Sequence, residues 1–135
     1  MKRILVIEDD KAIRNVVSRY LTHAGYDVLT ASNGLEGVEV FRSCPDFIDL
    51  VLTDLRMPVM TGNEAVHQIR LTRPDAKVIC MTGSSEDLRL KDIPVLEKPF
   101  SLKALQQSIS RLLAAVKDHA PAAVSSPGSG SFTIR

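Results

Sequence analysis

The sequence predicts an α/β domain of the doubly wound type, with a mainly parallel five-stranded sheet covered by helices on both faces. Two observations lead to this prediction. Short apolar runs alternate with segments of helical periodicity along the chain, and that order is typical of parallel strands joined by crossover helices. A length of 135 residues, of which 44% are hydrophobic and 24% charged, is sufficient for one globular domain with its own core.

The predicted strands are the apolar runs, because strands of a parallel sheet are buried on both faces. The fifth run contains Pro94. Proline cannot donate a ladder hydrogen bond, so we expect this strand at the edge of the sheet. In chain order the predicted strands are Ile4–Ile7, Tyr26–Ala31, Ile48–Thr53, Lys77–Met81 and Ile93–Leu96.

The predicted helices lie between and after these runs, where apolar residues recur at helical spacing. Gly25 follows the first helix in a position suited to a left-handed cap, and the second helix stops before Pro45 because the residue before proline disfavours helix. The fourth connection predicts only a short amphipathic turn. The predicted helices are 12–23, 34–44, 63–71, a short one within 84–92, and 102–116.

Residues 119–135 differ in composition from residues 1–118. They contain Ala-Pro-Ala-Ala followed by Ser, Pro and Gly, a composition typical of a flexible linker with too few apolar groups to pack. We therefore predict a domain over 1–118 and a flexible tail or linker over 119–135. A natural tail, the remainder of a longer protein and a cloning remnant all fit this segment.

The charge balance excludes several classes of partner. Seventeen basic and sixteen acidic residues give a net charge of +1, so we expect neither nucleic acid nor a membrane surface as a partner of this domain. No apolar run is long enough for a membrane span or a secretory signal, and we expect a cytoplasmic protein. Cys44 and Cys80 have no metal-ligand spacing and are predicted to be free thiols.

Polar residues whose side chains could take part in catalysis or metal binding follow four of the predicted strands. Glu8 and Asp9 follow the first, Asp54 the third, Thr82 the fourth and Lys98 the fifth. In an open parallel sheet the functional groups gather at the carboxyl ends of the strands, so these side chains should converge. Each signal is weak alone, since acidic pairs often cap helices and Thr-Gly often marks a turn. Their combination at successive strand ends favours a functional site.

Three carboxylates placed together repel one another unless a cation lies among them. Mg²⁺ suits such a site because it binds oxygen ligands and needs only one or two carboxylates. We expect Asp9 and Asp54 as direct ligands, Glu8 as a ligand through water, and a backbone carbonyl after Asp54. Asp54 could then attack phosphorus as a nucleophile, with Lys98 and the metal stabilising the phosphoryl charge and Thr82 donating a hydrogen bond.

Other chemically capable residues have simpler interpretations. The three histidines show no clustering and are predicted to lie at the surface. Met57 and Met60 flank a proline in the loop after Asp54 and are predicted to serve packing. The histidines are His23, His67 and His119.

The chain also resembles the receiver domains of two-component response regulators over roughly residues 2–117. Four motifs carry the resemblance and occur in the family's order. They are Ile4-Leu5-Val6-Ile7-Glu8-Asp9-Asp10, Leu52-Thr53-Asp54-Leu55-Arg56-Met57-Pro58 with Thr61-Gly62, Met81-Thr82-Gly83, and Glu97-Lys98-Pro99-Phe100.

The resemblance implies a flavodoxin-like fold with strand order 2-1-3-4-5 flanked by five helices, and a cis peptide bond at Lys98–Pro99. It implies that Asp54 accepts a phosphoryl group from a phosphohistidine on a sensor histidine kinase or a histidine phosphotransfer protein. A downstream protein target or a fused output domain would read the switch. By the same match, the Mg²⁺ ligands are Glu8, Asp9, Asp54 and the Arg56 carbonyl, and Thr82 and Lys98 contact the phosphoryl group.

Two features depart from the family pattern. Val95 stands where receivers usually carry Tyr or Phe, and a valine side chain is stiff and lacks a ring. Only fifteen residues separate Thr82 from Lys98, so the fourth helix must be shortened. We therefore expect signalling through a remodelled fourth-helix region, or partners that bind the first helix and the loops of the site directly.

Two other classes of function stay open at this point. An aspartyl-nucleophile phosphohydrolase of the haloacid dehalogenase type needs a second acid two residues after the nucleophile, where this chain has Arg56. A phosphorylation-independent scaffold is the other alternative, which Val95 keeps open although all the catalytic positions are filled. The leading prediction is a signalling switch that supports its own phosphorylation and dephosphorylation, and not an enzyme acting on a diffusing substrate.

Overall fold

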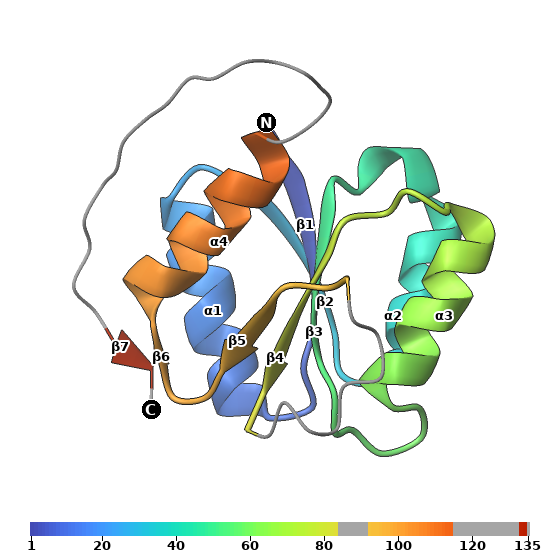
Figure 1. Cartoon of the computed structure of the whole chain (residues 1–135), viewed down its shortest axis with the longest axis horizontal. Helices are drawn as coiled ribbons and strands as arrows, with labels where there is room; N and C mark the ends of the chain where they lie inside the picture. The colour runs from blue at the N-terminus through green and yellow to red at the C-terminus, as the bar shows by residue number, and fades with distance from the viewer. Residues whose placement is uncertain (84–91, 115–132, 135) are drawn as a thin grey trace.

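A computed structural model describes residues 1–83, 92–114 and 133–134. Its main sheet has five parallel strands in the order β2-β1-β3-β4-β5, as predicted. Figure 1 shows the sheet edge-on, with α1 and α4 on one face and α2 and α3 on the other. The elements are β1 (Arg3–Ile7), α1 (Lys11–His23), β2 (Asp27–Ala31), α2 (Gly34–Ser43), the 3₁₀ helix η1 (Pro45–Phe47), β3 (Leu50–Asp54), α3 (Gly62–Thr72), β4 (Val78–Thr82), β5 (Val95–Glu97), β6 (Phe100–Ser101), α4 (Leu102–Ala114) and β7 (Thr133–Ile134).

Alternate side chains of the central strands enter two separate cores. On β1, Leu5 and Ile7 belong to the core under α2 and α3, while Ile4 and Val6 belong to the core under α1 and α4. All four are 0% exposed, and burying such a side chain contributes about 1.5–3 kcal/mol. The continuous apolar run in the sequence therefore reflects burial on both faces of the sheet.

The helices begin with side-chain caps at the carboxyl edge of the sheet. Asn33 and Thr61 accept hydrogen bonds from the backbone of the first turns of α2 and α3, and Asp10 does the same for α1. Such caps satisfy backbone N–H groups that have no partner inside the helix. Gly25 has a φ of 101° just after α1, in agreement with the predicted left-handed cap.

Several sequence expectations differ from the structure in detail. β5 starts at Val95, after Pro94, and lies at the edge of the sheet. The predicted short fourth helix falls on residues 84–91, outside the described residues, and the described residues contain four α-helices. Val16 and Leu35 fit the apolar spacing of their helices but are 46% and 44% exposed, because Val17 and Val38 occupy the buried faces of those helices.

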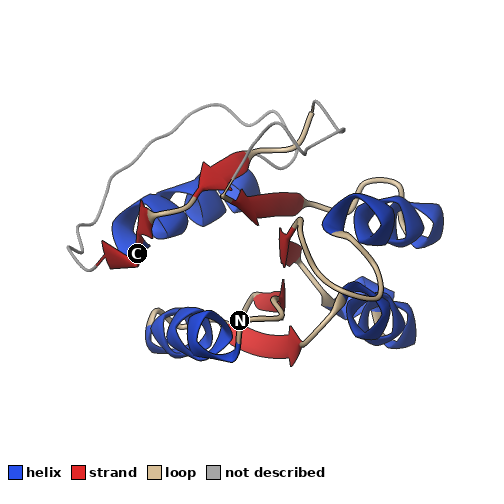
Figure 2. Ribbon diagram, turned by 90° about the horizontal axis from the view of Figure 1, so that it is seen from below, coloured by secondary structure: helices blue, strands red, loops and turns tan. Residues whose placement is uncertain are grey.

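The end of the chain adds an element that the composition did not predict. Thr133–Ile134 form β7, which pairs antiparallel with β6. Figures 1 and 2 both show β7 beside β6, close to the start of α4. Within the described residues no helix is both long and apolar enough to cross a membrane.

Candidate functional site

The end of β1 places one buried and one exposed carboxylate side by side. Glu8 is 0% exposed, whereas Asp9 is exposed to solvent. The Glu8 N–H donates to the Ala31 carbonyl at 3.1 Å, and the Arg14 guanidinium donates to the Glu8 carbonyl at 2.7 Å. These bonds hold the backbone from which both carboxylates project.

Asp10 caps a helix and does not extend the acidic group of Glu8 and Asp9. Its Oδ1 accepts from the N–H groups of Ala12 at 2.9 Å and Ile13 at 3.2 Å, and its own N–H donates to Glu8 Oε2 at 3.1 Å. The third acid of the run therefore starts α1 and helps to position the Glu8 side chain.

Asp54 ends β3 and is 7% exposed. Its Oδ1 accepts from the N–H of Leu55 at 2.8 Å, which leaves Oδ2 directed toward Lys98. Gly62, at the start of α3, lies so close that a Cβ there would collide with the Asp54 carbonyl and the Leu55 Cα. The Gly62 N–H donates to the Leu55 carbonyl at 2.8 Å. The Thr-Gly pair of the sequence thus allows the loop after Asp54 to close tightly.

Thr82 and Lys98 lie at the carboxyl ends of two adjacent strands, β4 and β5. Thr82 ends β4 and is 1% exposed, and its carbonyl accepts from the Lys98 N–H at 2.7 Å. The Lys98 ammonium lies 3.2 Å from Glu8 Oε1 and 3.5 Å from Asp54 Oδ2. The Lys98–Pro99 peptide bond is cis, as the resemblance implied.

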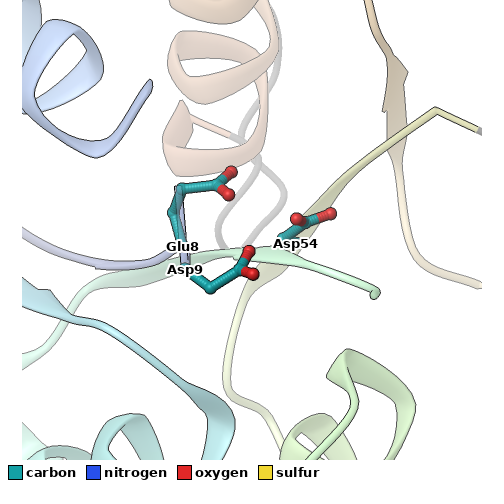
Figure 3. Close-up of side chains that lie close together, drawn as sticks. All are labelled: Glu8, Asp9 and Asp54. Carbon is teal, nitrogen blue, oxygen red and sulfur yellow. The ribbon is translucent and has the colours of Figure 1, made fainter. Parts of the chain in front are cut away.

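Figure 3 shows the side chains of Glu8, Asp9 and Asp54 close together, with the carboxylates of Glu8 and Asp9 directed toward the side on which Asp54 lies. Glu8, Asp9 and Asp54 each offer an oxygen, and these oxygens lie within 4.8 Å of one another. An all-oxygen donor set of this kind fits a hard divalent cation such as Mg²⁺. The convergence expected from the strand ends is therefore present in the structure.

Burial and neighbouring charges shift the pKa values of Glu8 and Lys98. Burial raises the pKa of Glu8 from 4.5 to about 7, and the Asp54 carboxylate adds to the rise, while the Asp10 N–H and the Lys98 ammonium oppose it. Burial lowers the pKa of Lys98, but the two carboxylates outweigh that effect and raise its pKa above the usual value. When all three carboxyl groups are ionised, the single Lys98 ammonium leaves the group with a net negative charge, which a divalent cation would offset.

Cys44 and Cys80 are both free, as predicted. Burial, helped by the charge of Asp54, raises the pKa of the Cys80 thiol to about 12, so Cys80 stays protonated and packs as an apolar side chain. Met57 and Met60 pack against the core, as expected. His23 and His67 are exposed, as expected, and His119 lies outside the described residues.

The sequence also singled out Arg56, as a candidate ligand through its carbonyl, and Val95, as a departure from the family pattern. Arg56 is an exposed residue two positions after Asp54, and its carbonyl as a metal ligand stays a prediction. Val95 is half-buried on β5, opposite Cys80 of β4. Sequence reasoning missed the Arg14 contact to Glu8, because nothing in helical periodicity indicates where a long polar side chain ends.

Comparison with known proteins identifies the family. A family model described as the response regulator receiver domain matches residues 4–110. This chain is a response regulator receiver domain. The receiver is 36% identical over 121 residues to the response regulator receiver protein CpdR of Brucella abortus, covering 85% of this chain and 99% of CpdR.

The receiver also resembles parts of longer proteins. It is 34% identical over 116 residues to the sensor kinase CckA of Brucella abortus, covering 82% of this chain. That match spans 12% of the kinase, and the match to the sensor kinase LuxN of Vibrio harveyi spans 13%. The receiver therefore corresponds to a small part of these relatives.

Solved structures show the same fold. A response regulator receiver domain from Clostridium thermocellum superimposes with a TM-score of 0.79 and 31% identity, covering 84% of this chain and 95% of that one. The response regulator TrrA of Thermotoga maritima in complex with Mg²⁺-BeF has a TM-score of 0.72 and 32% identity, covering 83% and 99%.

Proposed function

We propose that this receiver carries a phosphoryl group on Asp54 and acts as a switch in a two-component phosphorelay. The observation that supports this most is the setting of the Asp54 carboxylate. One oxygen accepts from the Leu55 N–H, the other lies 3.5 Å from the Lys98 ammonium, and Asp54 offers an oxygen within 4.8 Å of oxygens of Glu8 and Asp9. A nucleophile held beside a cation site and an ammonium is the arrangement that phosphoryl transfer requires.

The donor in this proposal is a phosphohistidine on a sensor histidine kinase or a histidine phosphotransfer protein. An Asp54 carboxylate oxygen forms a bond to phosphorus while the bond between phosphorus and the histidine nitrogen breaks. The nitrogen keeps that electron pair, which leaves neutral histidine after proton exchange with water. Hydrolysis of the resulting acyl phosphate returns Asp54 to its free state, so this domain is reset rather than consumed.

The residues around Asp54 have separate roles. Asp9 and Asp54 would hold Mg²⁺ directly, with Glu8 acting through water and Arg56 through its carbonyl. When bound, Mg²⁺ neutralises charge on the phosphoryl oxygens. Lys98 offers an ammonium from 3.5 Å away, close enough to pair with a phosphoryl oxygen, and the Thr82 hydroxyl would donate to another.

The relatives support this proposal at the level of chemistry. TrrA was solved with Mg²⁺-BeF, and the matching parts of CckA and LuxN belong to sensor kinases. We therefore expect a kinase or phosphotransfer partner and a downstream protein target or fused output domain. Because Val95 replaces the usual aromatic residue, we expect the output to depend on residues 84–97 or on direct contacts to α1 and the site loops.

Incubation with acetyl phosphate and Mg²⁺, followed by intact mass measurement, tests the proposal. We expect one phosphoryl group that is stable in acid, labile in base and lost in Asp54→Asn. Asp46→Asn is a matched control, because Asp46 is an exposed aspartate in η1, before β3 begins. No adduct on the wild type would favour a scaffold, and steady turnover of phosphate esters would favour a phosphohydrolase.

A further inference from the structure

The short strand β6 lies immediately after the residues of the site. Phe100 and Ser101 directly follow Lys98–Pro99 and precede α4. They pair antiparallel with the end of the chain, Phe100 opposite Ile134 and Ser101 opposite Thr133. Figures 1 and 2 both show β7 next to β6, apart from the main sheet.

β6 is anchored well enough to present its backbone to another strand. The Phe100 side chain is 6% exposed and packs in the core under α4. The Ser101 hydroxyl accepts from the Ala104 N–H at 2.9 Å and so starts α4. Both side chains therefore contact the domain itself, and these contacts hold the β6 backbone in place. Extended peptides add to a strand edge through main-chain hydrogen bonds.

The length of the chain between α4 and β7 suits this pairing. α4 has 13 residues and is therefore about 20 Å long, and β7 lies beside its first turn, so the connection must return by roughly that distance. Eighteen residues, 115–132, separate α4 from β7 in the chain, and a fully extended chain of that length spans about 60 Å, so the connection is long enough to reach.

We propose that β6 is a strand-addition site beside the phosphorylation site, and that Thr133–Ile134 are its tethered occupant. β7 then covers the backbone that follows Lys98–Pro99, and an extended segment of a partner has to displace β7 to pair there. The residues of β7 suit this role, since Thr and Ile are β-branched and favour strands. This pairing exists in the unphosphorylated chain and does not depend on Asp54 accepting a phosphoryl group.

Amide hydrogen exchange, measured by NMR on the full unphosphorylated chain, tests the pairing. Directly opposed pairs in antiparallel strands alternate between bonded and non-bonded, so one of the Phe100 and Ser101 amides should be protected by β7. In the double variant Thr133→Pro/Ile134→Pro that amide should exchange about fivefold faster, the loss expected for one net hydrogen bond. Ser125→Pro adds a proline between α4 and β7 and should leave the rate unchanged. Equal rates in the wild type and the double variant would overturn the proposal.

A disulfide measurement gives a second, independent readout. Ser101→Cys with Thr133→Cys joins two directly opposed positions, while Ser101→Cys with Ser125→Cys shares the loss of the α4 cap and differs only in the tail position. Both pairs carry Cys44→Ser, because Cys44 is the half-buried thiol. In a glutathione buffer we expect the 101–133 bond to form at about tenfold higher effective concentration than the 101–125 bond. Equal values would show that the tail has no preferred place on β6.

Discussion

Replacing Glu8 by Gln should change how the stability of the metal-free domain depends on pH. The Glu8 side chain is fully buried, and its pKa is raised from 4.5 to about 7, chiefly by burial. The folded protein therefore holds this proton more tightly than the unfolded chain does. As the pH rises from 4.5 to 7, ionisation of Glu8 in the fold costs stability, and above pH 7 the whole cost is present.

The size of this cost follows from the pKa difference. A shift from 4.5 to about 7 corresponds to about 3 kcal/mol, at about 1.4 kcal/mol for each pH unit. Gln has nearly the same shape, can accept hydrogen bonds from Asp10 and Lys98, and does not ionise. The variant should therefore gain about 3 kcal/mol relative to the wild type between pH 4.5 and pH 8.

Urea unfolding in the presence of EDTA at pH 4.5, 6 and 8 measures the free energy of unfolding of both proteins. The contributions of the other titrating groups cancel in the difference, because both proteins contain them. Glu36→Gln is a control of opposite sign, since hydrogen bonds from Ser32 lower the pKa of the exposed Glu36. With saturating Mg²⁺ the wild type should recover its stability at pH 8, because the cation favours ionised Glu8. A difference between Glu8→Gln and wild type that is the same at all three pH values would refute the reasoning.

Three further predictions concern individual residues. Gly62→Ala should lower the free energy of unfolding by about 1–3 kcal/mol, because the added Cβ collides with the Asp54 carbonyl; an unchanged urea midpoint would contradict the close approach. Val59→Gly should raise it by about 0.5–1 kcal/mol, because Val59 has a φ of 73°, costly for a β-branched residue; a lower midpoint would show that Val59 makes contacts worth more than the strain. Lys98→Met should slow phosphorylation by acetyl phosphate about 10²-fold, since it removes the ammonium beside Asp54, and a wild-type rate would exclude Lys98 from the transfer step.

Much of the fold could be predicted because parallel sheets obey simple rules. Apolar runs such as Ile4–Ile7 are buried on both faces, and the strand ends bring Glu8, Asp54 and Lys98 together at one edge. Composition and periodicity alone did not give the strand order; it came from the resemblance of the motifs.

Other features depend on contacts that no local pattern records. The pairing of β7 with β6 joins backbone groups far apart in the chain, and backbone pairing leaves little trace in side-chain periodicity. The bond from Arg14 to the Glu8 carbonyl depends on one rotamer of a long side chain. Val16 fits the helical pattern but lies at the border of the apolar stripe and is exposed. Full burial of Glu8 could not be foreseen either, because an acid after a strand is usually solvated.

The central claim is that Asp54 carries the phosphoryl group and that Mg²⁺ is needed for the transfer. The most direct measurement is reduction of the acetyl phosphate-treated protein with borohydride, which converts an aspartyl phosphate to homoserine, followed by residue-level mass spectrometry. We predict homoserine at position 54 alone, formed with Mg²⁺ and absent with EDTA. Homoserine at another aspartate, or equal amounts at position 54 with EDTA, would contradict the claim.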